Sequence, residues 1–99
     1  MEIAAWKEFK EEDLTINCRL QLSYTDGRKV KTVLKQLKEW HQCGTGYDPK
    51  EKKDILIFVR KFQDDKSWKS FLRNFPFTIS EILRNNKKKV YNAKKKKSS

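Results

Sequence analysis

The sequence predicts an α+β fold that is mainly helical. We expect about four or five short helices around an aromatic core, with one strand or short hairpin and a basic C-terminal tail. Three observations support this: apolar residues at helical spacing between residues 48 and 86, one segment that alternates like a strand, and lysines concentrated at the C-terminus. We expect a single compact domain over residues 1–86 and a flexible tail over residues 87–99.

The first helix of segment 48–86 is predicted to begin at Asp48. The Asp48 carboxylate can accept backbone N–H groups, Pro49 lacks an N–H that would have no partner there, and Glu51 can reach back to the cap. The apolar residues that follow have the spacing of one helix face: Ile55, Phe58, Val59 and Phe62. The apolar run 55–59 would also suit a buried strand, but we favour the helix.

Two more helices are predicted in the same segment. Asp64 or Asp65 can cap a helix that ends before Pro76, with an apolar face made by Trp68, Phe71, Leu72 and Phe75. Residues 78–81 match a capping box, which predicts a helix carrying Ile79, Ile82 and Leu83 on one side. We expect one shared core that includes Leu37, Phe58, Trp68, Phe71 and Phe75.

The residues around Pro76 resemble a known family. Leu72, Phe75-Pro76, Thr78 and Ile82-Leu83 are spaced as at the hinge between helices in the N-terminal domain of transcription elongation factor S-II. The match covers about a quarter of the chain. The resemblance implies a helical module that docks other proteins in the nucleus.

The N-terminal half contains the clearest strand signal. Residues 14–24 alternate strictly between apolar and polar side chains, which predicts a strand with one face in water. Before it, residues 2–12 have apolar residues at intervals of three and predict a short helix. After it, Asp26-Gly27 suits a tight turn, and a helix is predicted from about Lys29 to Gln42. Residues 43–47 are predicted to be a linker.

A single strand in a helical domain needs a partner for its backbone groups. Residues 28–33 can pair with strand 14–24, and this is the simpler arrangement. Alternatively one edge of the strand is open, and a homodimer through strand 14–24 or the addition of a partner peptide completes it.

The net charge of +11 is concentrated at the C-terminus. Residues 84–99 contain eight of the 24 basic residues and none of the 13 acidic residues. Lysine clusters bind phosphates with little dependence on base sequence, and Tyr91 can stack on a base. The predicted nucleic-acid-binding residues are Arg84, Lys87, Lys88, Lys89, Tyr91, Lys94, Lys95, Lys96 and Lys97.

The sequence therefore predicts a non-enzymatic nuclear binding module that contacts DNA or RNA with low sequence specificity. The alternative is a helical protein–protein interaction domain of a transcription or chromatin regulator, in which the same lysines act as an import signal. Either function places the protein in the nucleus.

Catalysis, cofactors and metals are not expected. His41 and Cys43 supply too few groups for a structural zinc site, and Asp64-Asp65 is more typical of a helix cap than of an acid pair. With only two cysteines we expect a reducing intracellular compartment. We expect no membrane partner, because the longest apolar run is only about five residues.

Overall fold

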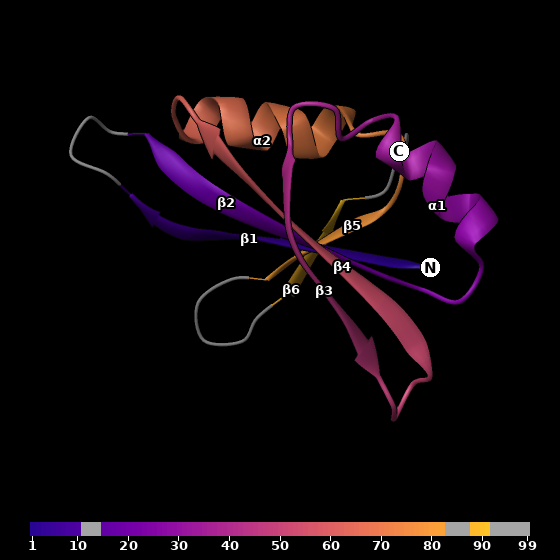
Figure 1. Ribbon diagram of the computed structural model, residues 1–99. Helices are drawn as coiled ribbons and strands as arrows, with labels where there is room; N and C mark the ends of the chain where they lie inside the picture. Colours follow the sequence, from indigo (N-terminus) through magenta and orange to yellow (C-terminus); the bar gives the residue numbers. More distant parts are fainter. Residues whose placement is uncertain (11–14, 83–87, 92–99) are drawn as a thin grey trace.

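The chain folds mainly as a sheet. The structure is a computed structural model that describes residues 1–10, 15–82 and 88–91. Its elements in chain order are β1 (Glu2–Lys10), β2 (Ile16–Tyr24), α1 (Gly27–Leu34), β3 (His41–Asp48), β4 (Lys53–Phe62), α2 (Asp65–Asn74), β5 (Ile79–Ile82) and β6 (Lys88–Tyr91). The prediction of a mainly helical fold with four or five helices is wrong, because the described residues form a mixed sheet with two short helices (Figure 1).

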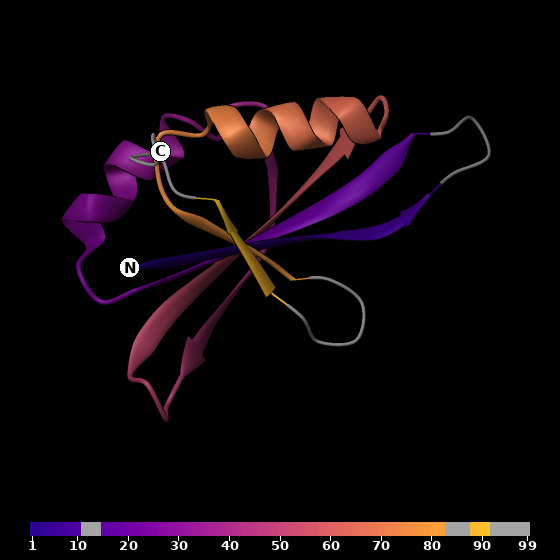
Figure 2. The ribbon, with the colours of Figure 1, turned by 180° about the vertical axis from the view of Figure 1, so that it is seen from behind.

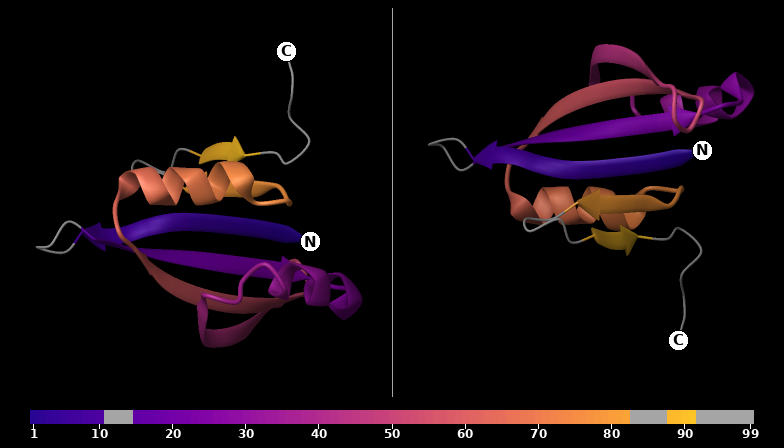
Figure 3. Two further views of the ribbon diagram at one scale, coloured as in Figure 1. Left: turned by 90° about the horizontal axis from the view of Figure 1, so that it is seen from above. Right: turned by 90° about the horizontal axis from the view of Figure 1, so that it is seen from below.

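The six strands form one sheet in the order β3-β4-β2-β1-β5-β6. Figure 3 shows them following one another from one edge to the other. Neighbouring strands are antiparallel except for β1 and β5, which run parallel. A parallel pair needs a long crossover connection, and here the chain from β2 to α2 provides it.

The predicted strand 14–24 is confirmed over residues 16–24 as β2, while Leu14 lies outside the described residues. The prediction of its pairing partners is wrong. Both of its edges are paired within the chain, with β1 on one side and β4 on the other. Residues 28–33 do not pair with it, since they lie in α1. β2 therefore has no free edge, and the predicted route to a homodimer or to peptide addition through this strand is closed.

Both helices begin at aspartate caps. The Asp26 carboxylate accepts a hydrogen bond from the backbone N–H of Arg28 at 3.0 Å, and that of Asp64 accepts one from Ser67 at 2.8 Å. The predicted cap at Asp64 is confirmed, as is the helix that follows it. The helix predicted from Lys29 to Gln42 is shorter: α1 ends at Leu34, and β3 begins at His41.

Inward residues of the sheet and both helices share one core, as expected. Phe58, Trp68, Phe75 and Leu37 are buried in a single cluster, and Phe71 packs against it partly exposed. Figures 1 and 2 show α2 lying across the strands on the upper side, with α1 beyond its C-terminal end. The helices thus cover one face of the sheet, which we call the covered face. We call the other the open face, since no described helix packs on it.

The helix predicted over residues 2–12 is a strand, β1. Ile3 and Ala5 point into the core, whereas Trp6 is half-buried on the open face. The spacing of three between Ile3, Trp6 and Phe9 therefore combines positions that lie on different faces. An irregularity in the pairing with β2 between Lys7 and Phe9 adds to this, because it shifts the alternation.

The helix predicted to begin at Asp48 does not form, and its apolar residues belong to strand β4, which was the alternative for run 55–59. Phe58 and Phe62 are buried on the covered face, while Ile57 lies half-buried on the open face. A strand that is apolar on both faces lacks alternation and imitates a helix. Asp48 does accept backbone N–H groups, from Lys50 at 3.0 Å and Glu51 at 3.3 Å, but it does so in the turn between β3 and β4.

Further expectations differ from the structure. The linker 43–47 lies within β3, and the capping box 78–81 lies largely in β5, where Ile79 and Glu81 are buried. The resemblance to the S-II domain implied a helix over this segment, so its implied helical fold is contradicted. Four residues of the expected tail, Lys88–Tyr91, form β6 at the edge of the sheet.

Candidate functional site

The structure describes only part of the predicted nucleic-acid-binding segment. Lys88, Lys89 and Tyr91 belong to β6, and their backbone register places Lys89 opposite Glu81 and Tyr91 opposite Ile79. The other predicted residues lie outside the described ones: Arg84, Lys87, Lys94, Lys95, Lys96 and Lys97. The basic segment is thus joined to the folded domain at one edge of the sheet.

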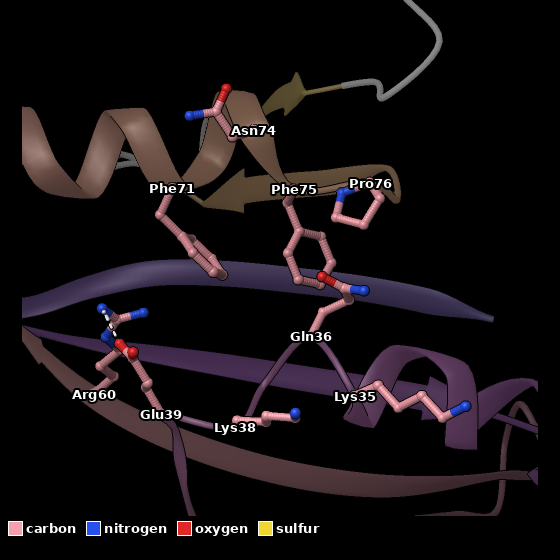
Figure 4. Close-up of a pocket in the computed structure, with 9 residues that line it drawn as sticks. All are labelled: Lys35, Gln36, Lys38, Glu39, Arg60, Phe71, Asn74, Phe75 and Pro76. Atoms are coloured by element: carbon pink, nitrogen blue, oxygen red, sulfur yellow. Dashed lines mark ion pairs between the residues drawn. The ribbon is translucent and has the colours of Figure 1, made fainter.

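A second feature was not predicted: a hollow of about 330 Å³ between the loop after α1 and the C-terminal end of α2. Its lining comes from three segments that are distant in sequence (Figure 4). The lining residues are Lys35, Gln36, Lys38, Glu39, Arg60, Phe71, Asn74, Phe75 and Pro76. We call it the helix-loop hollow.

Buried anchors hold the loop side of the hollow in place. After α1 the backbone continues in tight turns, with hydrogen bonds from Leu37 N–H to Leu34 O and from Trp40 N–H to Leu37 O, each 3.0 Å. Leu37 and Trp40 are buried in the core. The residues beside these anchors, at positions 35, 36, 38 and 39, are exposed. The loop is therefore fixed by its apolar residues and presents its polar residues around the hollow.

The α2 side of the hollow is aromatic. Phe75 is buried and Phe71 is half-exposed, with 5.2 Å between their ring centroids. The Phe71 ring also lies 5.4 Å from Trp40 and 5.6 Å from Phe62. Such contacts are favourable beyond the burial of area. Phe71 is thus a firmly supported apolar surface at the wall of the hollow.

The charges around the hollow are mainly positive. The Arg60 guanidinium lies 4.4 Å from the centroid of the Phe62 ring and forms an ion pair with Glu39 at 2.7 Å. The Glu39 side chain is 74% exposed, so this pair is largely in water and contributes little to stability. Lys35 and Lys38 form no ion pair with any residue that the structure describes. Three cations and one carboxylate therefore surround the aromatic side of the hollow formed by Phe71 and Phe75. We call this aromatic side the floor.

The residues considered for chemistry do not form a reactive cluster. His41 and Cys43 are exposed on the edge strand β3, and Asp64 serves as a helix cap. Burial raises the pKa of the Cys18 thiol to about 12, so it stays protonated. Within the described ranges, no three histidine, cysteine or acidic residues gather closely enough to hold a metal ion.

Glu81 is the buried carboxylate of the described core. It is 5% exposed and accepts a hydrogen bond from Trp68 Nε1 at 2.9 Å. A buried carboxylate needs hydrogen-bond donors, and the indole N–H of Trp68 is one. Sequence reasoning placed Glu81 in a helix cap, and nothing in the linear pattern indicated this contact. Glu81 therefore has a structural role, since its hydrogen bond with Trp68 links β5 to α2.

The comparisons with known proteins add no relative. No protein-family model, no curated protein and no solved structure matches the chain. In the part of the chain that the structure describes, no helix is long and apolar enough to cross a membrane.

Proposed function

We propose that the protein is a non-enzymatic module that binds DNA or RNA through its basic C-terminal segment with low sequence specificity. The observation that carries the proposal is the charge distribution: residues 84–99 contain eight basic and no acidic residues. Basic side chains displace counterions from phosphates, which gives affinity without base recognition. The position of β6 supports the proposal, because it joins the start of the lysine-rich segment to a folded scaffold.

The experiment that tests the proposal changes charge and leaves β6 intact. Deleting residues 87–97 would remove a strand of the sheet, so we choose the substitution of Lys94, Lys95, Lys96 and Lys97 by Gln instead. The matched control substitutes four exposed lysines elsewhere by Gln: Lys29, Lys31, Lys50 and Lys66. Both variants have the same reduction in net charge.

The measurement is affinity for random duplex and single-stranded oligonucleotides as a function of salt. For duplex DNA, each phosphate that a lysine neutralises adds about 0.9 to the slope of log affinity against log salt. We expect the slope of the C-terminal variant to be smaller by about 3 if most of the four lysines bind phosphate. The control should change much less. Equal effects of the two variants, or no binding by the wild type at low salt, would reject the proposal.

A further inference from the structure

We propose that the helix-loop hollow binds one nucleotide unit of a single-stranded nucleic acid, with its base against Phe71 and its phosphate on Lys35 and Lys38. This inference rests on the proposed function and extends it from the C-terminal segment to the folded domain. It is carried by the combination of an aromatic floor with cations that have no described partner.

The floor suits a planar ring. Bases of single strands are commonly bound by stacking on aromatic side chains, and this requires a ring that is accessible and does not move. Phe71 is half-exposed and is held by Trp40, Phe62 and Phe75 at centroid distances of 5.4, 5.6 and 5.2 Å. In a duplex the faces of the bases are covered by their neighbours, so only an unpaired base can lie on this surface.

The cations are placed along the side of the hollow opposite α2. Figure 4 shows Lys38 between the Arg60–Glu39 pair and Lys35 on this side. The Arg60 guanidinium, 4.4 Å from the centroid of the Phe62 ring, is a third cation on this side and is paired with Glu39.

An amide side chain completes the set of groups. Figure 4 shows the Gln36 amide beside the Phe75 ring, whereas Asn74 points away from the floor. An amide offers both a donor and an acceptor, as the edge of a base does. An acidic peptide would use the cations through its carboxylates, but acidic side chains carry no planar ring to lie against Phe71, so we favour the nucleotide.

The first test uses nuclear magnetic resonance of the full chain with adenosine monophosphate as the probe. Trp40 is a built-in reporter because its ring lies 5.4 Å from Phe71, and Trp6 is the control because it lies on the open face. We expect the Trp40 indole signal and the backbone signals of residues 35–39 to shift, while the Trp6 indole stays in place. Absence of a shift at Trp40 at low salt overturns the inference, as does a shift caused by poly-glutamate but not by the nucleotide.

The second test compares two pairs of lysines. Lys35→Ala with Lys38→Ala removes the proposed phosphate-binding groups, and Lys66→Ala with Lys69→Ala removes the same charge from the exposed side of α2. For a single-stranded oligothymidylate, the first pair should lower the salt slope by about 0.7, since the one phosphate that these two lysines neutralise contributes about 0.7. The second pair should lower the salt slope less. For duplex DNA, the two pairs of substitutions should have equal effects on affinity.

The outcomes separate the two proposals. If oligothymidylate binding is abolished in the C-terminal lysine variant but is equal in the two lysine pairs, the inference is overturned and the proposed function stands. If the wild type binds no oligonucleotide at low salt, both are overturned. A selective reduction of single-strand binding in the Lys35 and Lys38 variant supports the inference, and the C-terminal lysine variant tests the proposed function separately.

Discussion

The two faces of the sheet come from the same strands but differ in what covers them. On β2, Leu20 and Leu22 face the helices and are fully buried, whereas Arg19 and Gln21 on the open face are half-exposed. The covered face is packed with apolar and aromatic side chains. The open face instead combines half-buried apolar residues with polar contacts such as the Arg19–Glu8 ion pair at 3.4 Å. Stability should therefore depend mainly on the covered face, and substitutions can be tolerated on the other.

The largest contrast is expected between the two cysteines. Cys18 is fully buried on the covered face, and burial raises its thiol pKa to about 12, whereas Cys43 is exposed on β3. Because the thiolate is the reactive form, a thiol reagent should modify Cys43 quickly and Cys18 only after unfolding. Mass spectrometry should find one modified thiol in the native chain and two in denaturant. Rapid modification of both native thiols would contradict the assignment of faces.

The next contrast compares side chains of similar size on the two faces. Leu20→Ala on β2 should cost about 2–5 kcal/mol of unfolding free energy, because it leaves a cavity in the buried core. Ile57→Ala on β4 should cost clearly less, since Ile57 lies half-buried on the open face. Denaturant unfolding of the two variants measures both values. Equal losses of stability would mean that the open face is also packed in the folded protein.

A smaller effect is expected from the polar contact of the covered face. Glu81→Ala removes the acceptor of the Trp68 indole N–H and leaves it buried without this partner, at a cost of about 1–3 kcal/mol. Glu81→Gln is the matched control because its amide oxygen can accept the same hydrogen bond. Thermal unfolding should rank wild type and Glu81→Gln above Glu81→Ala. If Gln and Ala destabilise equally, the hydrogen bond is not the reason that Glu81 lies there.

The smallest effect concerns the cap of α2. The hydrogen bonds from Ser67 lower the pKa of the Asp64 carboxyl below its usual value of 3.8. Because this pKa is lower in the folded chain than in the unfolded chain, the ionised cap stabilises the folded state at pH values above the unfolded pKa. This stabilisation is lost as the pH falls through the folded pKa. Asp64→Asn keeps a capping group that does not titrate. The difference in melting temperature between wild type and this variant should therefore change only in acid, below about pH 4. A constant difference over all pH values would argue against the cap.

The difference between the two faces also explains which helices and strands could be predicted from the sequence. β2 was identified because one of its faces is buried and the other is wet, so its side chains alternate. α2 was identified because Asp64 caps it and its apolar residues lie on one side. β4 was not, because Ile57 and Phe58 are both apolar although they lie on opposite faces. In β1 and β5, sequence spacing suggested helices, while pairing with neighbouring strands decided the structure.

The candidate site was only partly accessible to such reasoning. The basic C-terminal segment is visible as a run of lysines, but the helix-loop hollow is assembled from the loop after α1, Arg60 of β4 and the end of α2. Its cations and aromatic residues come from segments that are far apart in the sequence. Lys35-Gln36 and Lys38-Glu39 are an exposed polar cluster between buried anchors, and that pattern was the local signal. The strand pairing that brings it close to Phe71 cannot be deduced from spacing.

The position of β2 between β1 and β4, in a sheet covered on one face, is the central claim about the fold of this protein. It is tested most directly by backbone nuclear Overhauser effects of the isotope-labelled chain. We predict cross-strand effects from Leu20 to Ala5 on one side and to Phe58 on the other, because these residues are opposite each other in the two pairings. Helical sequential effects over residues 2–10 or 53–62, without those cross-strand signals, would contradict it.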